Sequence, residues 1–373
     1  MKTEDFFFEL PEHLVAQHPA LQRGQSRLMT LDRATGMRSH TSISQLPQIL
    51  CGGCFLSPRG EKPLLVFNDT KVLKARLAGK NERTGAETEF LLLEEIEGEK
   101  GQGSLWKAMA RRARRKKPGT VYLFFDGEGA QVAKAQVAGA QTAGAPASSA
   151  HGEYLLLEFD RTIDEQWLEK YGHVPLPPYI KRKDAPEDAR RYQTVYARQI
   201  GSAAAPTAGL HFTQEILDAL SALGIGSAFV TLHVGPGTFL PVRSQNIEDH
   251  VMHEERFIIT EENAALIEKA KKDGRRIVAV GTTSLRAMES AFCADGIKRG
   301  RQDTRIFIYP PYKFKSADAL FTNFHTPLST LLMLVSAFAD GAFNGRELIL
   351  ESYAEAVREG YRFFSYGDAM LVY

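Results

Sequence analysis

Short apolar runs alternate with polar turns between residues 72 and 160. Four of these runs have the length and residue types of β-strands: Thr88–Leu93, Leu105–Ala110, Thr120–Phe125 and Tyr154–Phe159. Strands of this length, separated by turns, are typical of a small antiparallel barrel or sandwich. The stretch 127–150 is rich in Ala, Gly and Ser and has almost no large apolar side chain. We expect it to be a mobile loop without site chemistry.

Elsewhere, apolar strands mix with helical patterns. The expected strands are Arg27–Asp32, Leu64–Phe67, Gly226–His233, Arg256–Thr260, Ile277–Val280 and Arg305–Tyr309. The expected helices are Gln214–Leu223, Glu261–Asp273, Leu328–Ala339 and Tyr353–Tyr361. This alternation predicts an α/β fold. We expect a mixed α/β main domain made of residues 1–71 and 161–373, with a small antiparallel β-barrel domain, residues 72–160, inserted into it.

Composition narrows the class of protein. The 373 residues are 43% hydrophobic and 24% charged, which is typical of one or two soluble domains. No apolar run approaches about 18 residues, and the acidic start has no signal-peptide pattern, so we expect no membrane association and a cytoplasmic location. Cys51 and Cys54 lack the further ligands that a structural zinc site needs. The formal net charge of +1 means that any nucleic-acid binding requires a local basic patch.

Three segments between residues 201 and 286 have the composition of ligand-binding turns. They are Gly201–Thr213, Thr231–Phe239 and Ile277–Arg286, and each joins an apolar strand or a helix start to Gly, Pro, Thr and His. Glycine allows close backbone approach, and hydroxyl and imidazole groups supply hydrogen bonds. The candidate ligand-binding residues are Pro206, Thr207, Gly209, Gly235, Gly237, Thr238, Gly281, Thr282, Thr283, Ser284 and Arg286.

The third segment has the clearest local pattern. Gly281 turns the chain after a buried strand, and Thr282, Thr283 and Ser284 are good N-cap residues for the helix that follows. A helix start of this kind leaves N–H groups free to bind a carboxylate or phosphate, with Arg286 one turn further on. An ordinary helix cap after a strand explains the same residues equally well.

Two basic clusters could contact RNA phosphates. The first holds Arg111, Arg112, Arg114, Arg115 and Lys116, and the second holds Lys181 and Arg182 with Tyr192 nearby. Clustered cations bind phosphates, and aromatic rings stack on bases. A solvated loop is an equally good interpretation of the first cluster.

Two histidines lie inside the glycine-rich turns. His211 and His233 could carry out acid–base chemistry, although a structural hydrogen-bonding role is as plausible for either. His250 and His253 could share a helical face, but the arrangement of a known metal motif is missing, so we expect no metal. The pattern of a nucleotide-hydrolysing P-loop is missing as well.

Longer motifs resemble one known family. They include Leu10–Gln17, Val66–Leu77, Gly172–Ile180, Pro206–Phe212, His233–Phe239, Gly281–Arg286, Phe321–His325 and Phe364–Met370. Together these segments resemble the S-adenosylmethionine:tRNA ribosyltransferase-isomerase family of queuosine biosynthesis. The sequence departs from the family pattern in Val72–Leu77, Tyr309–Tyr312 and Asn323–Pro327, but none of these departures removes a residue of the three central segments.

The resemblance implies a fold, a reaction and a partner. The fold is an α/β domain with an inserted β-barrel. The reaction moves the ribosyl part of S-adenosylmethionine onto the aminomethyl group of 7-aminomethyl-7-deazaguanine in a tRNA anticodon stem-loop and rearranges it, giving epoxyqueuosine, adenine and methionine. The ligand-binding residues above would then hold S-adenosylmethionine. Candidates for the catalytic base are His211, His233 and His253, with Asp69 as an outside choice.

Two other functions are compatible with parts of the sequence. An S-adenosylmethionine-dependent RNA methyltransferase would release S-adenosylhomocysteine instead of adenine and methionine. A non-enzymatic RNA-binding module would not need the His, Gly and Thr density of residues 201–286. We expect a monomer.

Overall fold

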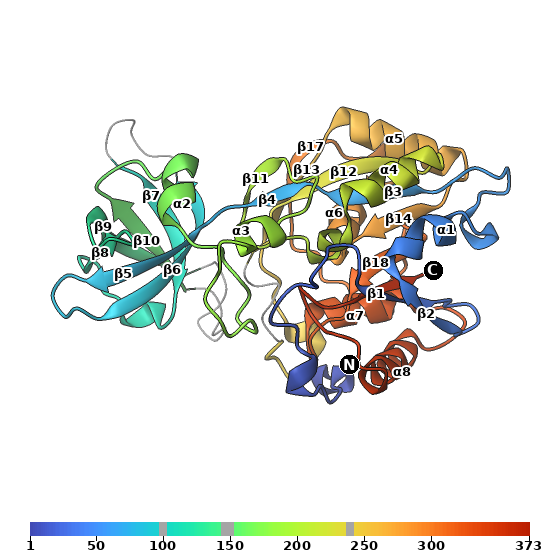
Figure 1. Ribbon diagram of the computed structural model, residues 1–373, viewed down its shortest axis with the longest axis horizontal. Coiled ribbons are helices and arrows are strands. Elements are labelled where there is room, and N and C mark those ends of the chain that lie inside the picture. Colours follow the sequence, from blue (N-terminus) through green and yellow to red (C-terminus); the bar gives the residue numbers. More distant parts are fainter. Residues whose placement is uncertain (97–102, 143–152, 236–241) are drawn as a thin grey trace.

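A nine-stranded sheet organises the larger part of the protein (Figure 1). The computed structural model describes residues 1–96, 103–142, 153–235 and 242–373. The strands lie in the order β17 (Gly300–Thr304), β13 (Glu255–Ile259), β12 (Gly226–Leu232), β3 (Leu64–Asn68), β14 (Ile277–Val280), β18 (Ala319–Asn323), β19 (Ala369–Val372), β1 (Arg27–Leu31) and β2 (Arg38–Ser42). The four central strands β12, β3, β14 and β18 are mutually parallel. Their carboxyl ends therefore meet at one edge of the sheet.

Helices cover both faces of this sheet. They are α1 (Leu46–Leu50), α4 (Gln214–Ala222), α5 (Glu261–Lys272), α6 (Thr282–Ala291), α7 (Thr330–Phe338) and α8 (Gly345–Arg358). Alternate residues of a strand face opposite sides, and Val66 packs with the side chains of α5 to α8 whereas Phe67 packs with those of α1 and α4. Every residue of β3, β14, β18 and β19 is buried. This is why these strands are mostly apolar rather than alternating, with polar residues only at the carboxyl ends of β3 and β18.

Six antiparallel strands form a closed barrel beside the sheet (Figure 1). Their order is β10 (Glu153–Phe159), β7 (Leu105–Ala110), β6 (Glu87–Ile96), β5 (Arg76–Asn81), β8 (Val121–Phe125) and β9 (Gln131–Thr142). The barrel has its own core, in which Phe90, Trp106, Phe124 and Leu157 are buried. The fold class predicted from the sequence, α/β with an antiparallel barrel, is confirmed.

The expected loop at 127–150 is wrong in its first half, because Gln131–Thr142 is strand β9. Ala133, Ala135 and Val137 alternate into the barrel core, where small side chains fit between the large aromatic ones. Residues 143–150 lie outside the described residues. The strand expected at Arg305–Tyr309 is also wrong, because the strand lies just before it, at Gly300–Thr304.

Short elements connect the sheet and the barrel. β4 (Thr70–Val72) pairs in parallel with β11 (Gln199–Ser202), and this ribbon lies between the two units in Figure 1. The other short elements are α2 (Glu165–Tyr171), α3 (Asp188–Arg191), β15 (Phe292–Cys293) and β16 (Gly296–Ile297). We keep the division into residues 1–71, 72–160 and 161–373 as a proposal. None of the described helices is long and apolar enough to cross a membrane.

Candidate functional site

Polar residues gather where the four parallel strands end. β12 is followed by His233, β3 by Asp69, β14 by Gly281, and β18 ends at Asn323. Ligands of open α/β sheets bind outside the carboxyl ends of the strands.

Asn68 holds these strand ends together. Its Nδ2 donates to the backbone oxygen of Leu232 at 3.0 Å and to Oγ1 of Thr283 at 3.2 Å. Its Oδ1 accepts from the backbone N–H of Leu232 at 3.0 Å and of Thr70 at 3.2 Å. One buried amide therefore fixes the end of β12, the turn after β3 and the first turn of α6.

A pocket opens at this edge. Its lining is Ala205, Thr207, Ala208, Val234, Gly281, Thr282, Thr283, Thr322, Asn323, His325 and Leu331. It thus draws on all three ligand-binding segments expected from the sequence and adds a fourth, the end of β18. Mixed apolar and hydroxyl lining of this kind suits a small organic molecule with a polar end.

The start of α6 differs from the expected cap. Gly281 occupies the N-cap position with φ of 91°, and no side chain caps the helix. Ser284 instead donates from Oγ to the backbone oxygen of Val280 at 2.7 Å. The hydroxyls of Thr282 and Thr283 line the pocket beside the first turn. A positive φ suits glycine here, because a side chain at this position would be strained.

Arg286 is not among the residues that line this pocket, although the sequence led us to expect it at the ligand. Its side chain is buried, forms an ion pair with Glu255, and donates from Nη2 to the backbone oxygen of Ile306 at 3.3 Å. Glu255 also accepts from the N–H of Gly235 at 3.2 Å. The guanidinium already has a carboxylate partner, so we assign it a structural role in supporting the turn after β12.

Of the other expected ligand-binding residues, two lie at the turn after β11 and two lie outside the described residues. Pro206 precedes the 3-10 turn Thr207–His211. Gly209 within that turn lies so close to Tyr196 that a Cβ would come within 2.1 Å of the phenol oxygen, so glycine is required there by packing. Gly237 and Thr238 lie outside the described residues.

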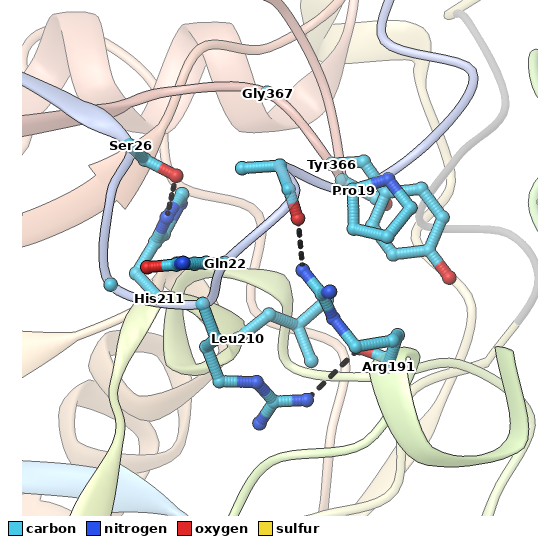
Figure 2. Close-up of a pocket in the computed structure, with 12 residues that line it drawn as sticks. Pro19, Gln22, Ser26, Arg191, Leu210, His211, Tyr366 and Gly367 are labelled. Carbon is cyan, nitrogen blue, oxygen red and sulfur yellow. Dashed lines mark hydrogen bonds between the residues drawn. The ribbon is translucent and has the colours of Figure 1, made fainter. Parts of the chain in front are cut away.

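His211 is held between two side chains. Its Nδ1 lies 3.0 Å from Oγ of Ser26 (Figure 2), and its Nε2 lies 2.9 Å from Nδ2 of Asn323. Burial, reinforced by Arg23 and Arg362, lowers the pKa of His211 to about 3. The amide donates to Nε2, so that nitrogen has no lone pair left for a proton from a substrate. These contacts favour the structural interpretation of this histidine.

The other expected catalytic groups have different surroundings. Nδ1 of His233 lies 2.8 Å from Oγ1 of Thr70, and burial together with Arg256 and Arg301 lowers its pKa. His253 lies in a coil segment, not on a helix, with Nδ1 3.3 Å from the phenol oxygen of Tyr154 in the barrel. Burial raises the pKa of Asp69, although Oγ1 of Thr231 donates to its carboxylate at 2.6 Å.

Sequence reasoning missed the polar end of β18. His325 lines the pocket, with Nε2 3.4 Å from Oγ1 of Thr322 and Nδ1 3.4 Å from the phenol oxygen of Tyr353. Burial lowers its pKa to about 3. Oδ1 of Asn323 is buried and has no hydrogen-bond partner among the described residues. The signal was present in the sequence, because Asn323 and His325 follow an apolar strand in the same way as the three segments identified.

The basic residues are distributed between surface and core. Arg111, Arg112, Arg115 and Lys181 are exposed, whereas Lys116 donates to Oγ1 of Thr88 at 2.9 Å. The side chain of Arg114 lies outside the described part.

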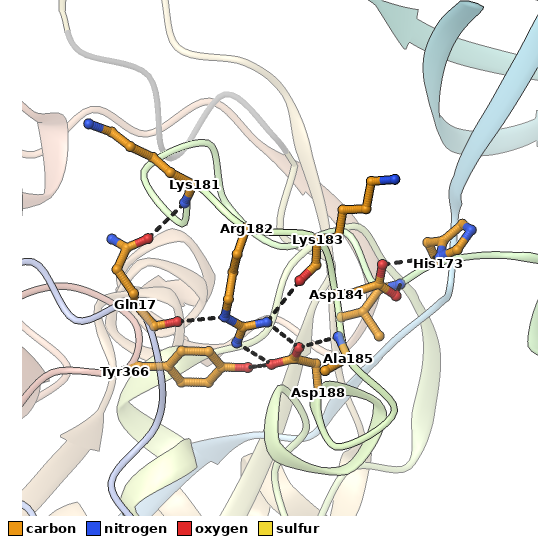
Figure 3. Close-up of polar contacts among 10 residues, drawn as sticks. Gln17, His173, Lys181, Arg182, Lys183, Asp184, Ala185, Asp188 and Tyr366 are labelled. Carbon is orange, nitrogen blue, oxygen red and sulfur yellow. Dashed lines mark hydrogen bonds and ion pairs between the residues drawn. The ribbon is translucent and has the colours of Figure 1, made fainter.

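The second cluster is held by ion pairs. Arg182 pairs with Asp188 at 2.6 Å (Figure 3), and Lys181 pairs with Glu12. The ring of Tyr192 is only 1% exposed and packs edge-on against Tyr366. It therefore offers no face to a base, and we do not carry it into the proposed RNA surface.

The described residues contain no group of three or more His, Cys, Asp or Glu side chains placed to hold a metal ion. The three cysteines, Cys51, Cys54 and Cys293, are free thiols.

A pocket at the carboxyl edge of a parallel sheet, lined by hydroxyl, amide and imidazole groups, is the arrangement of an α/β enzyme. Comparisons with known proteins specify which enzyme class this is. The S-adenosylmethionine:tRNA ribosyltransferase-isomerase of Treponema denticola is 50% identical over 374 residues, with both chains covered completely. The protein of the same name from Moorella thermoacetica is 48% identical over 373 residues, again with full coverage of both chains.

A solved structure and a family profile agree with these relatives. The crystal structure of the S-adenosylmethionine tRNA ribosyltransferase of Thermotoga maritima is 32% identical, covers 99% of this chain and 100% of that one, and gives a TM-score of 0.51. The profile described as queuosine biosynthesis protein matches residues 3–372. The protein is therefore a transferase enzyme. It belongs to the queuosine biosynthesis protein family.

Proposed function

We propose that this protein transfers the ribosyl part of S-adenosylmethionine to the aminomethyl group of 7-aminomethyl-7-deazaguanine in tRNA and isomerises it, yielding epoxyqueuosine-tRNA, adenine and methionine. The names of full-length relatives at 48–50% identity support the reaction class. The observation that carries the proposal is the pocket, because four strand ends bring its hydroxyl, amide and imidazole groups together in one place.

The pocket residues fit S-adenosylmethionine. Its methionine carboxylate would bind at the start of α6, where the hydroxyls of Thr282 and Thr283 and the helix N–H groups favour an anion. The unpartnered Oδ1 of Asn323 would accept a hydrogen bond from an amino or hydroxyl group of the ligand. Val234 and Leu331 supply apolar surface suited to an aromatic base.

The sulfonium of S-adenosylmethionine acidifies the neighbouring C5′ hydrogens. A base placed beside this carbon can therefore start the rearrangement. Among the described residues that line the pocket, His325 is the only histidine, aspartate or glutamate. Burial keeps the ring neutral near pH 7 but also makes it a weak base, with a pKa of about 3, so this role requires the bound substrate to raise that pKa toward neutrality. His233 is the second candidate, since Thr70 orients its ring at the neighbouring strand end.

The tRNA would lie across the exposed cations. Arg111, Arg112 and Arg115 on the barrel are exposed to phosphates, and Lys181 beside the sheet would exchange its exposed partner Glu12 for a phosphate. Arg114 belongs to the same run by sequence. Lys116 and Arg182 support these surfaces through their protein contacts.

Product analysis tests the proposed function. The protein is incubated with S-adenosylmethionine and an anticodon stem-loop RNA carrying 7-aminomethyl-7-deazaguanine, and the small molecules are separated by chromatography. We expect adenine and methionine in equal amounts, dependent on the modified base. Release of S-adenosylhomocysteine would assign a methyltransferase instead. No turnover together with tight RNA binding would assign a binding module.

A further inference from the structure

A second pocket lies beside His211 (Figure 2). Arg23, Arg191, Ser26, Ser365 and Tyr366 line it together with that histidine. Asn323, which lines the first pocket, contacts His211 at 2.9 Å. The Asn323–His211 pair is therefore a wall common to both pockets.

The second pocket holds positive charge that the protein leaves uncompensated. Nη2 of Arg23 donates only to neutral groups, the backbone oxygens of Arg190 at 3.0 Å and Arg191 at 3.3 Å. Within the described ranges, no carboxylate forms an ion pair with Arg23. Burial lowers the pKa of Arg23, and the nearby charges of Arg191 and Arg190 lower it further. A partly buried cation beside other cations is stabilised by an anion.

Arg191 adds a second guanidinium to the same wall. Its Nη2 donates to the backbone oxygen of Ala20 at 2.6 Å and its Nη1 to that of Leu21 at 3.3 Å. Its carboxylate partner is Glu187, 3.2 Å away and largely exposed. The two arginines and this one glutamate leave a net positive charge around the pocket.

The buried carboxylate of Asp188, on the same helix as Arg191, does not neutralise these arginines. Asp188 is fully engaged by Arg182 at 2.6 and 2.8 Å, by the N–H of Ala185 at 2.7 Å and by the phenol of Tyr366 at 2.7 Å (Figure 3). Burial would raise the pKa of Asp188, but these donors hold it at about 2. The network fixes α3 and Tyr366, which form two sides of the pocket. Within it, Arg182 and Asp188 neutralise each other, so Asp188 is not a counter-ion for Arg23 or Arg191.

We propose that this second pocket binds one phosphate of the RNA backbone close to the modified nucleotide. This inference rests on the proposed function, which makes an RNA the substrate. Arginine forks match the oxygens of phosphate and of carboxylate alike. A polyanion is favoured because exposed Lys181, Lys183 and Arg190 continue the positive charge outward from the pocket. A phosphate held here would place the adjoining nucleotide next to the wall of the reaction pocket.

Binding of a fluorescent anticodon stem-loop RNA across a salt series tests the proposal. For Arg23→Gln we expect the slope of log K against log salt to fall by about 0.7–0.9 and Kd near 0.1 M salt to rise roughly 5–10-fold. Arg23→Lys should keep most of the slope, because it keeps the charge. Arg59→Gln is the matched control, since this exposed arginine precedes the opposite, amino end of β3 and should leave the slope unchanged.

A second measurement works even if Arg23→Gln folds poorly. Stem-loops with a single uncharged methylphosphonate linkage are compared on wild-type protein and Arg23→Lys. Neutralising the one linkage that occupies the pocket should weaken binding to wild type and to Arg23→Lys by similar factors, because both keep a cation there, and should do so more than neutralising any other linkage. Equal losses at every linkage would overturn the proposal.

Calorimetric titration of Arg23→Gln with S-adenosylmethionine distinguishes the two anions that the pocket could bind, an RNA phosphate and the methionine carboxylate. Unchanged cofactor affinity together with the altered RNA slope supports the phosphate. A loss of cofactor affinity without an RNA effect would reassign the pocket to the methionine carboxylate and overturn the inference. Because RNA binding is measured without turnover, failure of this test is distinct from an absence of adenine release, which would contradict the proposed reaction.

Discussion

Nδ2 of Asn323 lies 2.9 Å from Nε2 of His211, and this contact fixes the protonation of the ring. The amide nitrogen can only donate, so Nε2 must be the unprotonated nitrogen and Nδ1 carries the hydrogen toward Ser26. The same amide nitrogen lies 3.3 Å from the backbone oxygen of Phe364, which agrees with its role as donor. A neutral imidazole is therefore built into the wall between the two pockets.

This neutral state predicts a loss of stability in acid. Burial lowers the pKa values of His211 and His325 to about 3, from 6.5 for the free side chain. Below pH 6.5 these two histidines become protonated in the unfolded chain but stay neutral in the folded protein. The free energy of unfolding therefore decreases as the pH falls toward 3. At pH 5 each histidine should reduce the free energy of unfolding by up to about 2 kcal/mol relative to neutral pH.

Denaturant unfolding between pH 8 and pH 4.5 measures this effect. His211→Asn should flatten the dependence on pH by up to one proton, and exposed His13→Asn is the control for the substitution itself, which should leave the free energy of unfolding at pH 8 near the wild-type value. An identical pH dependence in wild type and His211→Asn would show that the pKa of the ring is the same in the folded and unfolded protein, which would contradict this account.

The buried amide of Asn68 should matter for both stability and cofactor binding. Asn68→Ala leaves two backbone groups of Leu232 and one of Thr70 without their partner. We expect a loss of about 2–4 kcal/mol in unfolding free energy and weaker binding of S-adenosylmethionine, because the strand ends would no longer be tied together. Exposed Asn246→Ala, which loses one bond to Asp249, is the control and should change stability by less than about 0.5 kcal/mol. Native stability of Asn68→Ala would contradict this account.

Arg286 and Glu255 should behave as a structural pair. Arg286→Ala leaves a buried carboxylate, so we expect a loss of about 3–5 kcal/mol in unfolding free energy. The double variant Arg286→Met, Glu255→Gln removes both charges and should recover part of that loss. If Arg286→Ala instead remains stable and loses only cofactor affinity, the arginine contacts the ligand directly, as the sequence first indicated.

The fold could be predicted well where side chains are large. Runs of aromatic residues in the barrel and of apolar residues in the sheet indicate strands from the local sequence alone. Strand β9 does not, because Ala133 and Ala135 are small enough to resemble a low-complexity loop. Only the closure of the barrel shows that a strand with small side chains must fit there beside Phe124.

The site could be predicted to the level of segments but not of contacts. Rules for strand ends located Gly281 and Thr207, which both line the pocket. They placed Arg286 at the ligand, because sequence spacing does not reveal that Glu255, from a neighbouring part of the chain, reaches it first. His325 was overlooked although it follows an apolar strand, because the segment after β18 lacks the glycines that marked the other three segments.

The proton transfer that starts the reaction should depend on a histidine at the edge of the first pocket. We expect His325→Asn to reduce turnover at saturating substrates by at least about 100-fold, in the range typical of a lost acid or base. His233→Asn is tested in parallel, because its ring lies at the neighbouring strand end, 2.8 Å from Thr70. His211→Asn serves as the structural comparison and should show its effect mainly in melting temperature.

Comparing turnover, cofactor affinity and melting temperature for each variant identifies the catalytic base. A variant with near-native melting, unchanged cofactor affinity and greatly reduced adenine release identifies the base. Loss of turnover that follows loss of stability would indicate a packing role instead, and for His325 this outcome is distinguished by His325→Gln, which keeps a hydrogen-bonding group but no titrating ring. If the His325, His233 and His253 variants all turn over within about tenfold of wild type, the base is not a histidine of this set. Asp69→Asn is then the next variant, because burial raises the pKa of that carboxylate at the end of the neighbouring strand.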